Sequence, residues 1–424
     1  MDATEAINGR GRTLTGTTNI DSRASWAVAL TALGIYTVSF GAPYITVVGL
    51  KSIAAELGSA RSVPSLAFAL AWFGSAAGGI AMGWLAERVG VRWTVIGGAL
   101  SIATGLVLSS FGGQTTLLLS QGVFIGLLGN AGINAPLYVY VSRWFDRRRG
   151  SAVALISSGT YLAGAIWSAP FERAIALFGW RDTMLIYAVF EIAVIVPAAL
   201  IMFAPAPETA VPPRLPGAAT TRWVLGLRPS AVQSLLCFAG FLCCVPMAMP
   251  QGHLVAFCSD IGIPATHGAA MLSVLLGCAF LARVFWGLVT DRIGGLRTLL
   301  AGSVCQITAM IGFLVTQDEA GLFAVAAMFG LGFSGIIPAY VVAIRELFPA
   351  AEASWRIPTM LLFSGSGMAA GGWFAGLIYD YAGFYAAAFA TGIAFNLANL
   401  LVIVALVWRQ GRLHGPALAR ALSG

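Results

Sequence analysis

The amino-acid sequence predicts an all-α membrane protein with twelve transmembrane helices, arranged as two pseudo-symmetric bundles of six. Three observations lead to this prediction. Hydrophobic residues make up 58% of the 424 residues and charged residues only 10%, whereas soluble domains carry about a quarter charged residues. Apolar runs long enough to cross a bilayer follow one another along the chain, and short polar motifs recur at matching places in the two halves. Because so few charges cannot cover a surface in water, we expect lipid around most of the chain.

The chain divides into five segments. Residues 1–25 are polar and rich in Thr, Gly and Arg, so we expect a disordered cytoplasmic tail. Residues 26–203 and 231–408 contain the two six-helix bundles, residues 204–230 form a cytoplasmic linker, and residues 409–424 form a second cytoplasmic tail. The predicted spans are 26–50, 63–86, 94–111, 115–141, 151–171, 183–203, 231–258, 268–290, 297–315, 319–344, 357–378 and 384–408.

The distribution of Lys and Arg orients the spans. With the N-terminus in the cytoplasm, 19 Lys and Arg residues fall in inside segments and 4 in outside segments. Because cytoplasmic loops carry the excess of positive charge, we expect a multi-pass protein of the cytoplasmic (inner) membrane with both termini in the cytoplasm. The same residues account for the net charge of +7. They are dispersed among apolar spans rather than clustered on a polar domain, so we expect no nucleic-acid partner.

A polar loop occurs twice, after span two and after span eight. The copies read Gly83-Trp-Leu-Ala-Glu87-Arg88-Val-Gly90-Val-Arg92 and Gly287-Leu-Val-Thr-Asp291-Arg292-Ile-Gly294-Gly-Leu-Arg297. In each copy an acid followed by Arg lies at a cytoplasmic helix end, where it can bond neighbouring helix termini, and the next Gly permits a tight turn. We expect these to be cytoplasmic gate loops that act through Gly83, Glu87, Arg88 and Arg92 in the first copy and Gly287, Asp291, Arg292 and Arg297 in the second.

Arg283 lies inside the eighth apolar span. A charge at such a place costs ~3 to ~10 kcal/mol, so it normally faces a cavity and has a function. We interpret Arg283 as the anchor of a carboxylate, which a guanidinium binds in a bidentate manner. The alternative is that its side chain extends to the cytoplasmic interface, about seven residues or roughly 10 Å away. Because Arg283 is the only Lys or Arg that the sequence places this deep, a second negative charge on the ligand would be unpaired, which favours a monoanion.

The doubled gate loop resembles the signature of the major facilitator superfamily, and the resemblance covers residues from about 26 to 408. It implies the two-bundle transporter fold and alternating access. A narrower resemblance, to the monocarboxylate transporters and their bacterial relatives, which include the oxalate:formate antiporters, rests on three stretches. They are Asn134-x-Pro136 with Arg143-Trp-Phe-Asp-Arg147-Arg148-Arg149-Gly150, then Phe178-Gly179-Trp180-Arg181, and His253-Leu-Val-Ala-Phe-Cys-Ser-Asp260-x-Gly262. In that branch the Arg of span eight holds the substrate carboxylate, which implies this role for Arg283.

The sequence departs from that branch at three places. Tyr44 follows Pro43 where many members carry a Lys, Ala279 stands where animal-type members have an acid, and span eleven contains no Lys. No proton-coupling scheme therefore transfers from the branch, and dicarboxylate exchange is disfavoured.

Four further residues are candidates for substrate contact: Tyr44, Asn134, Tyr138 and Tyr340. Spans four and ten line the pathway in the superfamily, which implies that the last three lie there. Their amide and hydroxyl groups can bond a carboxylate. The alternative is that they only bond one helix to another.

His253 and Glu191 are candidates for the coupling proton. His253 lies in the outer half of span seven near Pro246 and Pro250, so its imidazole either carries a proton or bonds a backbone carbonyl freed by a Pro. Glu191 is the acid far from any predicted span end, and it is either a proton carrier or a protonated group at the lipid edge.

These features favour a secondary active transporter that moves a small organic monocarboxylate, lactate- or pyruvate-like or larger, together with a proton. A drug efflux transporter and an organic anion exchanger are the alternatives. A transporter-like sensor is disfavoured because the segment after Trp408 is short. We expect a monomer that is not an enzyme and holds no cofactor or metal, because the three His residues are scattered and no nucleophile–base set or phosphate-binding loop is evident.

Overall fold

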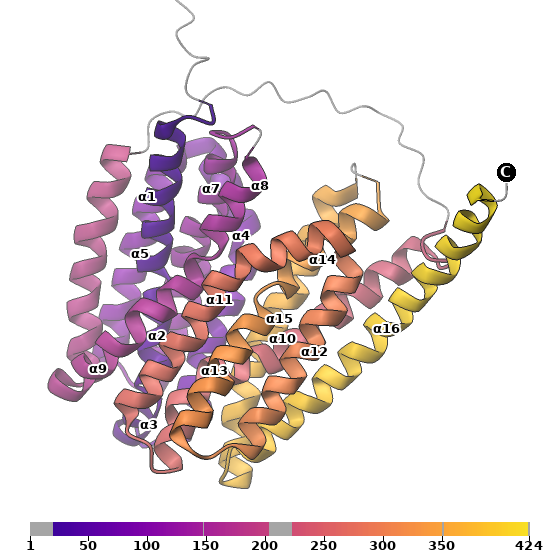
Figure 1. The fold of residues 1–424 in the computed structure, drawn as a ribbon. Helices are drawn as coiled ribbons and strands as arrows, with labels where there is room; N and C mark the ends of the chain where they lie inside the picture. Colours follow the sequence, from indigo (N-terminus) through magenta and orange to yellow (C-terminus); the bar gives the residue numbers. More distant parts are fainter. Residues whose placement is uncertain (1–19, 147, 203–222, 350–351, 423–424) are drawn as a thin grey trace, which may run out of the picture.

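The structure is a computed structural model that describes residues 20–146, 148–202, 223–349 and 352–422. Most of the expected N-terminal tail and most of the expected linker lie outside the described residues. The described residues are almost all helical, and their only strand-like pairing is the isolated bridge between Val224 and Leu227. The helices form two groups side by side (Figure 1), which we call the N-half, residues 23–202, and the C-half, residues 229–422.

The N-half begins with a crossing made of three consecutive short helices. The bounds of its elements are α1 (Arg23–Ser39), α2 (Gly41–Val48), α3 (Leu50–Glu56), α4 (Ser62–Val89), α5 (Val91–Phe111), α6 (Gln114–Leu119), the π-helix η1 (Ser120–Asn130), α7 (Ala131–Ser142), α8 (Arg149–Ser157) and α9 (Gly159–Met202). The fourth crossing is likewise composite, since α6, η1 and α7 follow one another without a loop.

The C-half repeats the pattern with longer continuous helices. Its elements are α10 (Pro229–Asp260), α11 (Ala265–Ile293), α12 (Gly295–Val315), α13 (Glu319–Phe333), α14 (Ile336–Leu347), α15 (Ala353–Ala382) and α16 (Ala386–Leu422). Residues 409–422 continue α16 as a helix.

The helix α9 holds two crossings. Eleven helices of the described chain are long and apolar enough to span a membrane, and one of them, Ser151–Ile201, is 51 residues long. At about 1.5 Å per residue that is more than twice the thickness of a bilayer core. The helical backbone breaks at Gly179, whose φ of 81° is a conformation that glycine adopts without strain. With this break the fold provides the twelve predicted crossings.

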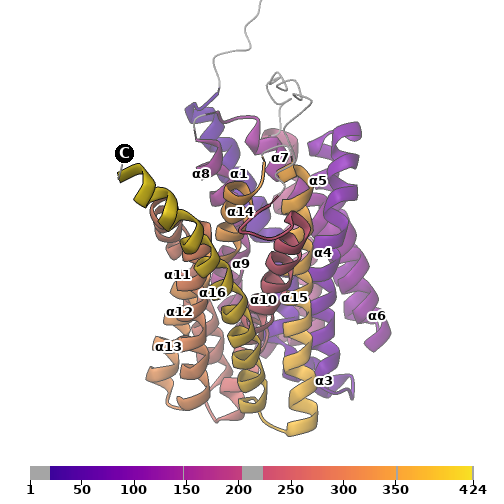
Figure 2. The ribbon, with the colours of Figure 1, turned by 90° about the vertical axis from the view of Figure 1, so that its right-hand side faces the viewer.

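The two ends of the bundles differ, and we name them by what they carry. The tail face holds the start of α1, the end of α9 and the start of α10; the loop face is opposite and holds α3 and the α10–α11 connection (Figures 1 and 2). Both predicted gate loops, α4–α5 and α11–α12, lie at the tail face.

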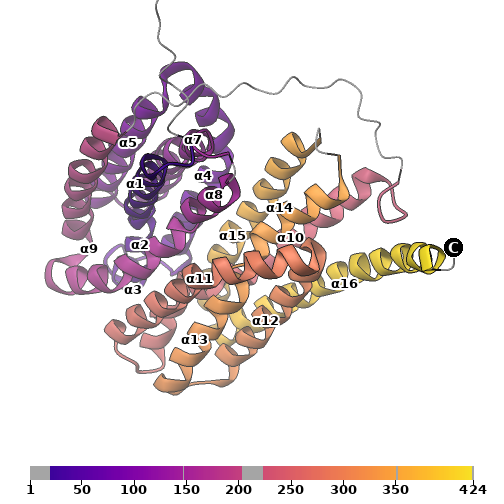
Figure 3. The same cartoon turned by 45° about the horizontal axis from the view of Figure 1, so that its top comes forward.

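Two pairs of long helices join the halves. α4 packs along α15, and α9 packs along α11 (Figure 3). Within the C-half, α15 also lies close against α10 at two of its glycines. A Cβ on Gly367 or Gly371 would collide with the backbone of Phe241 or Val245, respectively. These glycines therefore hold α10 and α15 backbone to backbone.

Candidate substrate site and loop-face gate

Arg283 lies within α11, ten residues before its end at Ile293, which is about 15 Å along the helix. Its guanidinium is turned toward the boundary between the halves. Nη2 donates a hydrogen bond of 3.0 Å to the Ser157 hydroxyl, and Nη1 donates to the Tyr161 hydroxyl at 3.3 Å. The Tyr161 ring also lies beneath the guanidinium, 5.2 Å from ring centre to Cζ. Ser157 and Tyr161 belong to the N-half, so the cation of one half is held by the other.

The third acceptor of Arg283 comes from its own half. Nη1 donates to the Ser334 carbonyl at 3.0 Å. Ser334 stands at the break between α13 and α14, and the residue four positions later is Pro338. Because proline has no N–H, Pro338 cannot donate the hydrogen bond that the Ser334 carbonyl would accept in a regular helix. The carbonyl is thus free to bind the guanidinium.

The surroundings of Arg283 are polar but neutral. Among the described residues no Asp or Glu lies within ion-pair distance of it, and its Nε has no hydrogen-bond partner there. Nearby, the hydroxyls of Tyr36 and Tyr138 are 3.4 Å apart. A half-buried cation whose described acceptors are hydroxyls and a carbonyl has no counter-ion beside it, so it can still attract an anion.

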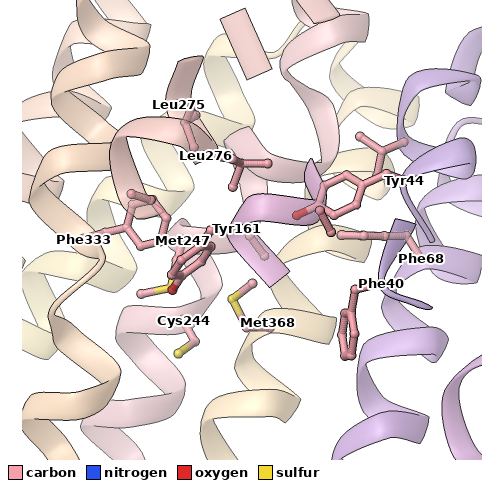
Figure 4. Packing of buried hydrophobic residues seen from close by; sticks show 14 of the residues in the cluster. Phe40, Tyr44, Phe68, Tyr161, Cys244, Met247, Leu275, Leu276, Phe333 and Met368 are labelled. Atoms are coloured by element: carbon pink, nitrogen blue, oxygen red, sulfur yellow. The ribbon is translucent and has the colours of Figure 1, made fainter. Parts of the chain in front are cut away.

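An apolar layer lies between Arg283 and the loop face. Leu276 is seven residues nearer to the loop-face end of α11 than Arg283, and Tyr44 is two turns beyond Tyr36. Side chains of both halves meet in this layer (Figure 4), where Tyr44 packs with Phe68 from α4 at 6.2 Å between ring centres. The layer separates the Arg283 site from the loop face.

Ion pairs connect the halves at the loop face. Arg61, just before α4, donates to Asp260 at the end of α10, with 2.9 Å between Nη2 and Oδ1, and Lys51 reaches the same carboxylate at 3.0 Å. The Asp380 carboxylate of α15 accepts the backbone N–H groups of Arg61 and Ser62, each at 2.9 Å. We call Arg61, Lys51, Asp260 and Asp380 the loop-face gate.

The predicted gate loops at the tail face are not paired in the same way. Glu87, Arg88, Asp291 and Arg292 are exposed, and within the described chain no ion pair joins either loop to the other half. Arg88 lies over the ring of Trp84. The halves are therefore linked by charges at the loop face and not by these loops at the tail face.

In each of the two loops, a glycine with positive φ forms the tight turn between the helices. Gly90 and Gly294 have φ of 90° and 83°, while Gly83 is half-buried and Gly287 exposed. Arg92 is half-buried and Arg297 exposed.

The structure places the other predicted substrate residues at different distances from Arg283. Tyr138 pairs with Tyr36 beside it, and Asn134 lies one turn before Tyr138 with its Oδ1 buried and without a partner in the described chain. Tyr44 is in the apolar layer, where its hydroxyl also has no described partner. Tyr340 points into the C-half and bonds Asn399 at 3.3 Å.

The two candidate proton carriers lie apart from Arg283. The imidazole of His253 is buried near the loop face and bonds the Tyr385 hydroxyl and the Gly372 carbonyl. Glu191 is fully buried in the N-half, and neither carboxyl oxygen has a hydrogen-bond partner in the described chain. It lies one turn after Tyr187, whose hydroxyl donates to the Val38 carbonyl at 2.6 Å.

Sequence reasoning did not identify Ser157, Tyr161 or Tyr36 as neighbours of Arg283, nor Arg61 and Asp260 as a gate. The sequence gives little signal for them, because hydroxyl residues are common in apolar spans. One signal was available for Ser334, because a proline four residues after a residue frees that residue's carbonyl.

The fold and the site define the class of protein. Two six-helix halves, a half-buried cation at their boundary, and a gate at one face are the parts of a secondary transporter. A family model described as Major Facilitator Superfamily matches residues 25–317. The chain belongs to this superfamily, which confirms the resemblance seen in the sequence.

Curated relatives and solved structures agree with this assignment. Monocarboxylate transporter 13 of Rattus norvegicus is 26% identical over 81% of this chain and 79% of its own length, and the MFS-type transporter pynF of Aspergillus niger is 25% identical over 77% and 75%. The fold resembles a bacterial homologue of the lysosomal transporter Spinster in an inward-facing and occupied conformation, with TM-score 0.66, 16% identity and coverage of 92% and 96%. It also resembles the peptide transporter POT in complex with alafosfalin, with TM-score 0.68, 14% identity and coverage of 93% and 96%.

Proposed function

We propose that the chain transports a small organic monocarboxylate across the cytoplasmic membrane by alternating access, with Arg283 as the substrate anchor. The observation that carries the proposal is the state of Arg283: a half-buried guanidinium at the boundary of the halves, whose hydrogen-bond acceptors in the described chain are all neutral. A carboxylate would replace weak neutral acceptors with a charge-assisted, bidentate pair. The likeness to monocarboxylate transporter 13 supports the same substrate class.

The groups around Arg283 suit one carboxylate and one further polar substituent. Ser157 and Tyr161 already point their hydroxyls at the guanidinium, and Tyr36 with Tyr138 supplies two more hydroxyls nearby. A 2-oxo or 2-hydroxy acid carries such a second polar group. Asn134 extends this polar wall. Tyr44 and Tyr340 join the site only if the halves or their own side chains rearrange.

Two observations support the assignment of this structure to the inward-facing state. With the tail face in the cytoplasm, as the Arg distribution requires, the loop-face gate closes the outer side. The doubled gate loops at the tail face are exposed and do not bridge the halves in the described chain. In the outward-facing state these loops would close the cytoplasmic side instead, through Glu87, Arg88, Asp291 and Arg292.

Substrate binding can then shift the equilibrium between the inward-facing and outward-facing states. In the empty carrier Arg283 links the halves through Ser157 and Tyr161. A carboxylate that takes over the guanidinium removes those links and changes the relative free energy of the two states. Coupling to one proton would make the uptake of a monoanion electroneutral. His253 lies at a junction of both halves, which favours it over Glu191 as the residue that binds the coupling proton.

Uptake into proteoliposomes tests the proposal. Labelled monocarboxylates, dicarboxylates and cationic drugs are offered with and without a pH gradient, to the wild type, Arg283→Lys and Arg283→Ala. Arg173→Ala, which removes an exposed arginine of α9, is the matched control. We expect monocarboxylate uptake, driven by external acid, that is lost in Arg283→Ala and kept in Arg173→Ala. Uptake that appears only against internal carboxylate would identify an anion exchanger, and carboxylate transport retained in Arg283→Ala would refute the anchor.

A further inference from the structure

A hydrogen-bonded chain leads from the loop-face gate into the protein interior. Arg61 Nη1 donates to the Tyr385 hydroxyl at 3.3 Å. That hydroxyl is 3.1 Å from His253 Nδ1, and His253 Nε2 is 2.8 Å from the Gly372 carbonyl oxygen. The chain crosses the boundary between the halves, because Arg61 is in the N-half while the other three residues are in the C-half: Tyr385 just before α16, His253 on α10 and Gly372 on α15.

The chemistry of its two ends fixes the direction of each hydrogen bond. A carbonyl only accepts, so His253 Nε2 carries a hydrogen and donates to Gly372. In the neutral imidazole Nδ1 is therefore an acceptor, and it takes the hydroxyl hydrogen of Tyr385. The Tyr385 oxygen is then free to accept from Arg61, which can only donate. Every donor in the chain has an acceptor, provided that the imidazole is neutral.

A proton on Nδ1 disrupts this arrangement. The imidazolium has two donors and no acceptor, so Nδ1–H would point at the Tyr385 oxygen and displace the hydroxyl hydrogen. Two cationic donors, Arg61 and His253, would then meet at one oxygen, and their repulsion in a buried place is strong.

The acidic groups nearby are already engaged. Asp260 on α10 binds Arg61 and Lys51, and Asp380 on α15 accepts the backbone N–H groups of Arg61 and Ser62 at the start of α4. The ring of Tyr379 on α15 covers the Arg61 guanidinium at 3.8 Å. If His253 gains a positive charge, the repulsion is therefore relieved by the release of Arg61 from the gate.

We propose that His253 positions Arg61 in the loop-face gate through Tyr385, and that the gate closes only while the His253 imidazole is neutral. His253 is buried beneath the closed gate, with 1% of its surface exposed. Protons from the loop side reach it when the gate is open, and a proton bound there holds the gate open. His253 is a positioning residue in this scheme, and the inference does not depend on which substrate Arg283 binds.

The test measures gate closure directly as a function of pH. Spin labels are placed on Thr115→Cys of α6 and Gln317→Cys before α13, two exposed positions at the loop face, one in each half. Cys278 and Cys305, the two cysteines that are not buried, are replaced by Ser. Distances between the labels are recorded for the full chain in lipid nanodiscs, without substrate, from pH 8 to pH 5.

Wild type should show a short distance at pH 8 and a growing long-distance population as the pH falls. One proton bound only to the open state changes the open-to-closed ratio by at most about tenfold per pH unit. His253→Gln keeps a donor toward Gly372 but cannot gain a proton, so its ratio should change less than about twofold over the whole range. Tyr385→Phe keeps the ring and breaks the chain, so it should be more open at pH 8 and equally insensitive to pH.

The matched control is His267→Gln. His267 is the other histidine at the loop face, and it pairs with Glu319 at 2.9 Å inside the C-half. This variant should titrate like the wild type. The proposal fails if the wild-type distances do not respond to pH, or if His253→Gln and Tyr385→Phe respond as the wild type does. If His253→Gln does not fold, the pH dependence of the label distance in Tyr385→Phe alone tests the proposal.

Discussion

Arg283 of α11 and Ser157 of α8 are joined by a hydrogen bond of 3.0 Å that crosses the boundary between the two halves. The bond makes Arg283, the proposed substrate anchor, part of the contact between the halves. A ligand that binds the guanidinium must therefore change this contact as well as fill a site.

Replacing Arg283 should remove carboxylate binding rather than merely slow transport. Arg283→Lys keeps the charge but loses the planar fork, and we expect affinity to fall by about 10-fold or more. Arg283→Ala should lower it by about 100-fold, as expected for the loss of a charged hydrogen-bonded pair. Equilibrium binding of a labelled monocarboxylate to purified protein measures both changes, and Arg173→Ala should bind as the wild type does.

Charge should govern which acids are transported. One guanidinium without a second cation leaves one carboxylate of a dianion unpaired, at a cost of several kcal/mol. We expect uptake of a fully ionised dicarboxylate such as oxalate to be about 100-fold or more below that of lactate at the same concentration. Parallel uptake measurements decide this, and equal rates for the two acids would contradict the charge-matching argument.

Ser157→Ala and Tyr161→Phe should shift the empty carrier away from the state described here. Each variant removes one hydrogen bond between Arg283 and the N-half, worth about 0.5–3 kcal/mol. The loop-face label distance should therefore lengthen at constant pH, by a population shift of about 2-fold to 10-fold or more. Ser142→Ala removes a half-buried hydroxyl at the end of α7 that donates to the Val139 carbonyl of the same helix, so it should leave the distance unchanged. Unaltered distances in both test variants would show that these bonds do not bias the carrier.

Glu56 should stabilise the loop side of the N-half in a pH-dependent way. Its carboxylate accepts from Arg181 Nε and Trp180 Nε1, each at 2.6 Å, and the bond to Arg181 lowers the pKa of Glu56. Because the folded pKa is below the unfolded one, the stabilisation is present above the unfolded pKa and is lost as pH falls through the folded pKa. The side chain is half exposed, so the effect at neutral pH is at most about 1 kcal/mol.

The measurement is the thermal unfolding midpoint in detergent at neutral and acidic pH. Glu56→Gln should lower the midpoint at pH 7 and reduce its loss on acidification. Glu172→Gln is the control, because Glu172 has no ion pair in the described part of the chain. A Glu56→Gln midpoint equal to that of the wild type at neutral pH would mean that the contact contributes nothing.

Glu191→Gln should leave proton-driven uptake within about twofold of the wild type. The carboxyl group has no hydrogen-bond partner in the described chain, and it contacts neither Arg283 nor the gate, so a neutral side chain of the same shape should suffice. Uptake under an imposed pH gradient measures this. Loss of the pH dependence with binding intact would instead assign the coupling proton to Glu191.

The sequence predicted the fold because periodic apolar runs and repeated loops are local signals. It also singled out Arg283, since a charge inside an apolar run is anomalous on its own. It did not predict Ser157 and Tyr161, which are more than 120 residues away in the other half, because their role arises only when the halves meet. It also proposed both Tyr138 and Tyr340 as substrate contacts, yet Tyr340 turns into the C-half where Asn399 offers an acceptor.

The glycine contacts of α15 have a consequence for how the loop-face gate opens. Gly367 and Gly371 hold α15 against the backbone of α10, so neither helix can slide along the other without a collision. One of these helices ends in Asp260 and the other carries Asp380 near its end, and both carboxylates hold the segment around Arg61. The two helices therefore move as one rigid unit that carries both carboxylates. Asp260 and Asp380 must leave the N-half together, so the outer side opens in one all-or-none step rather than contact by contact.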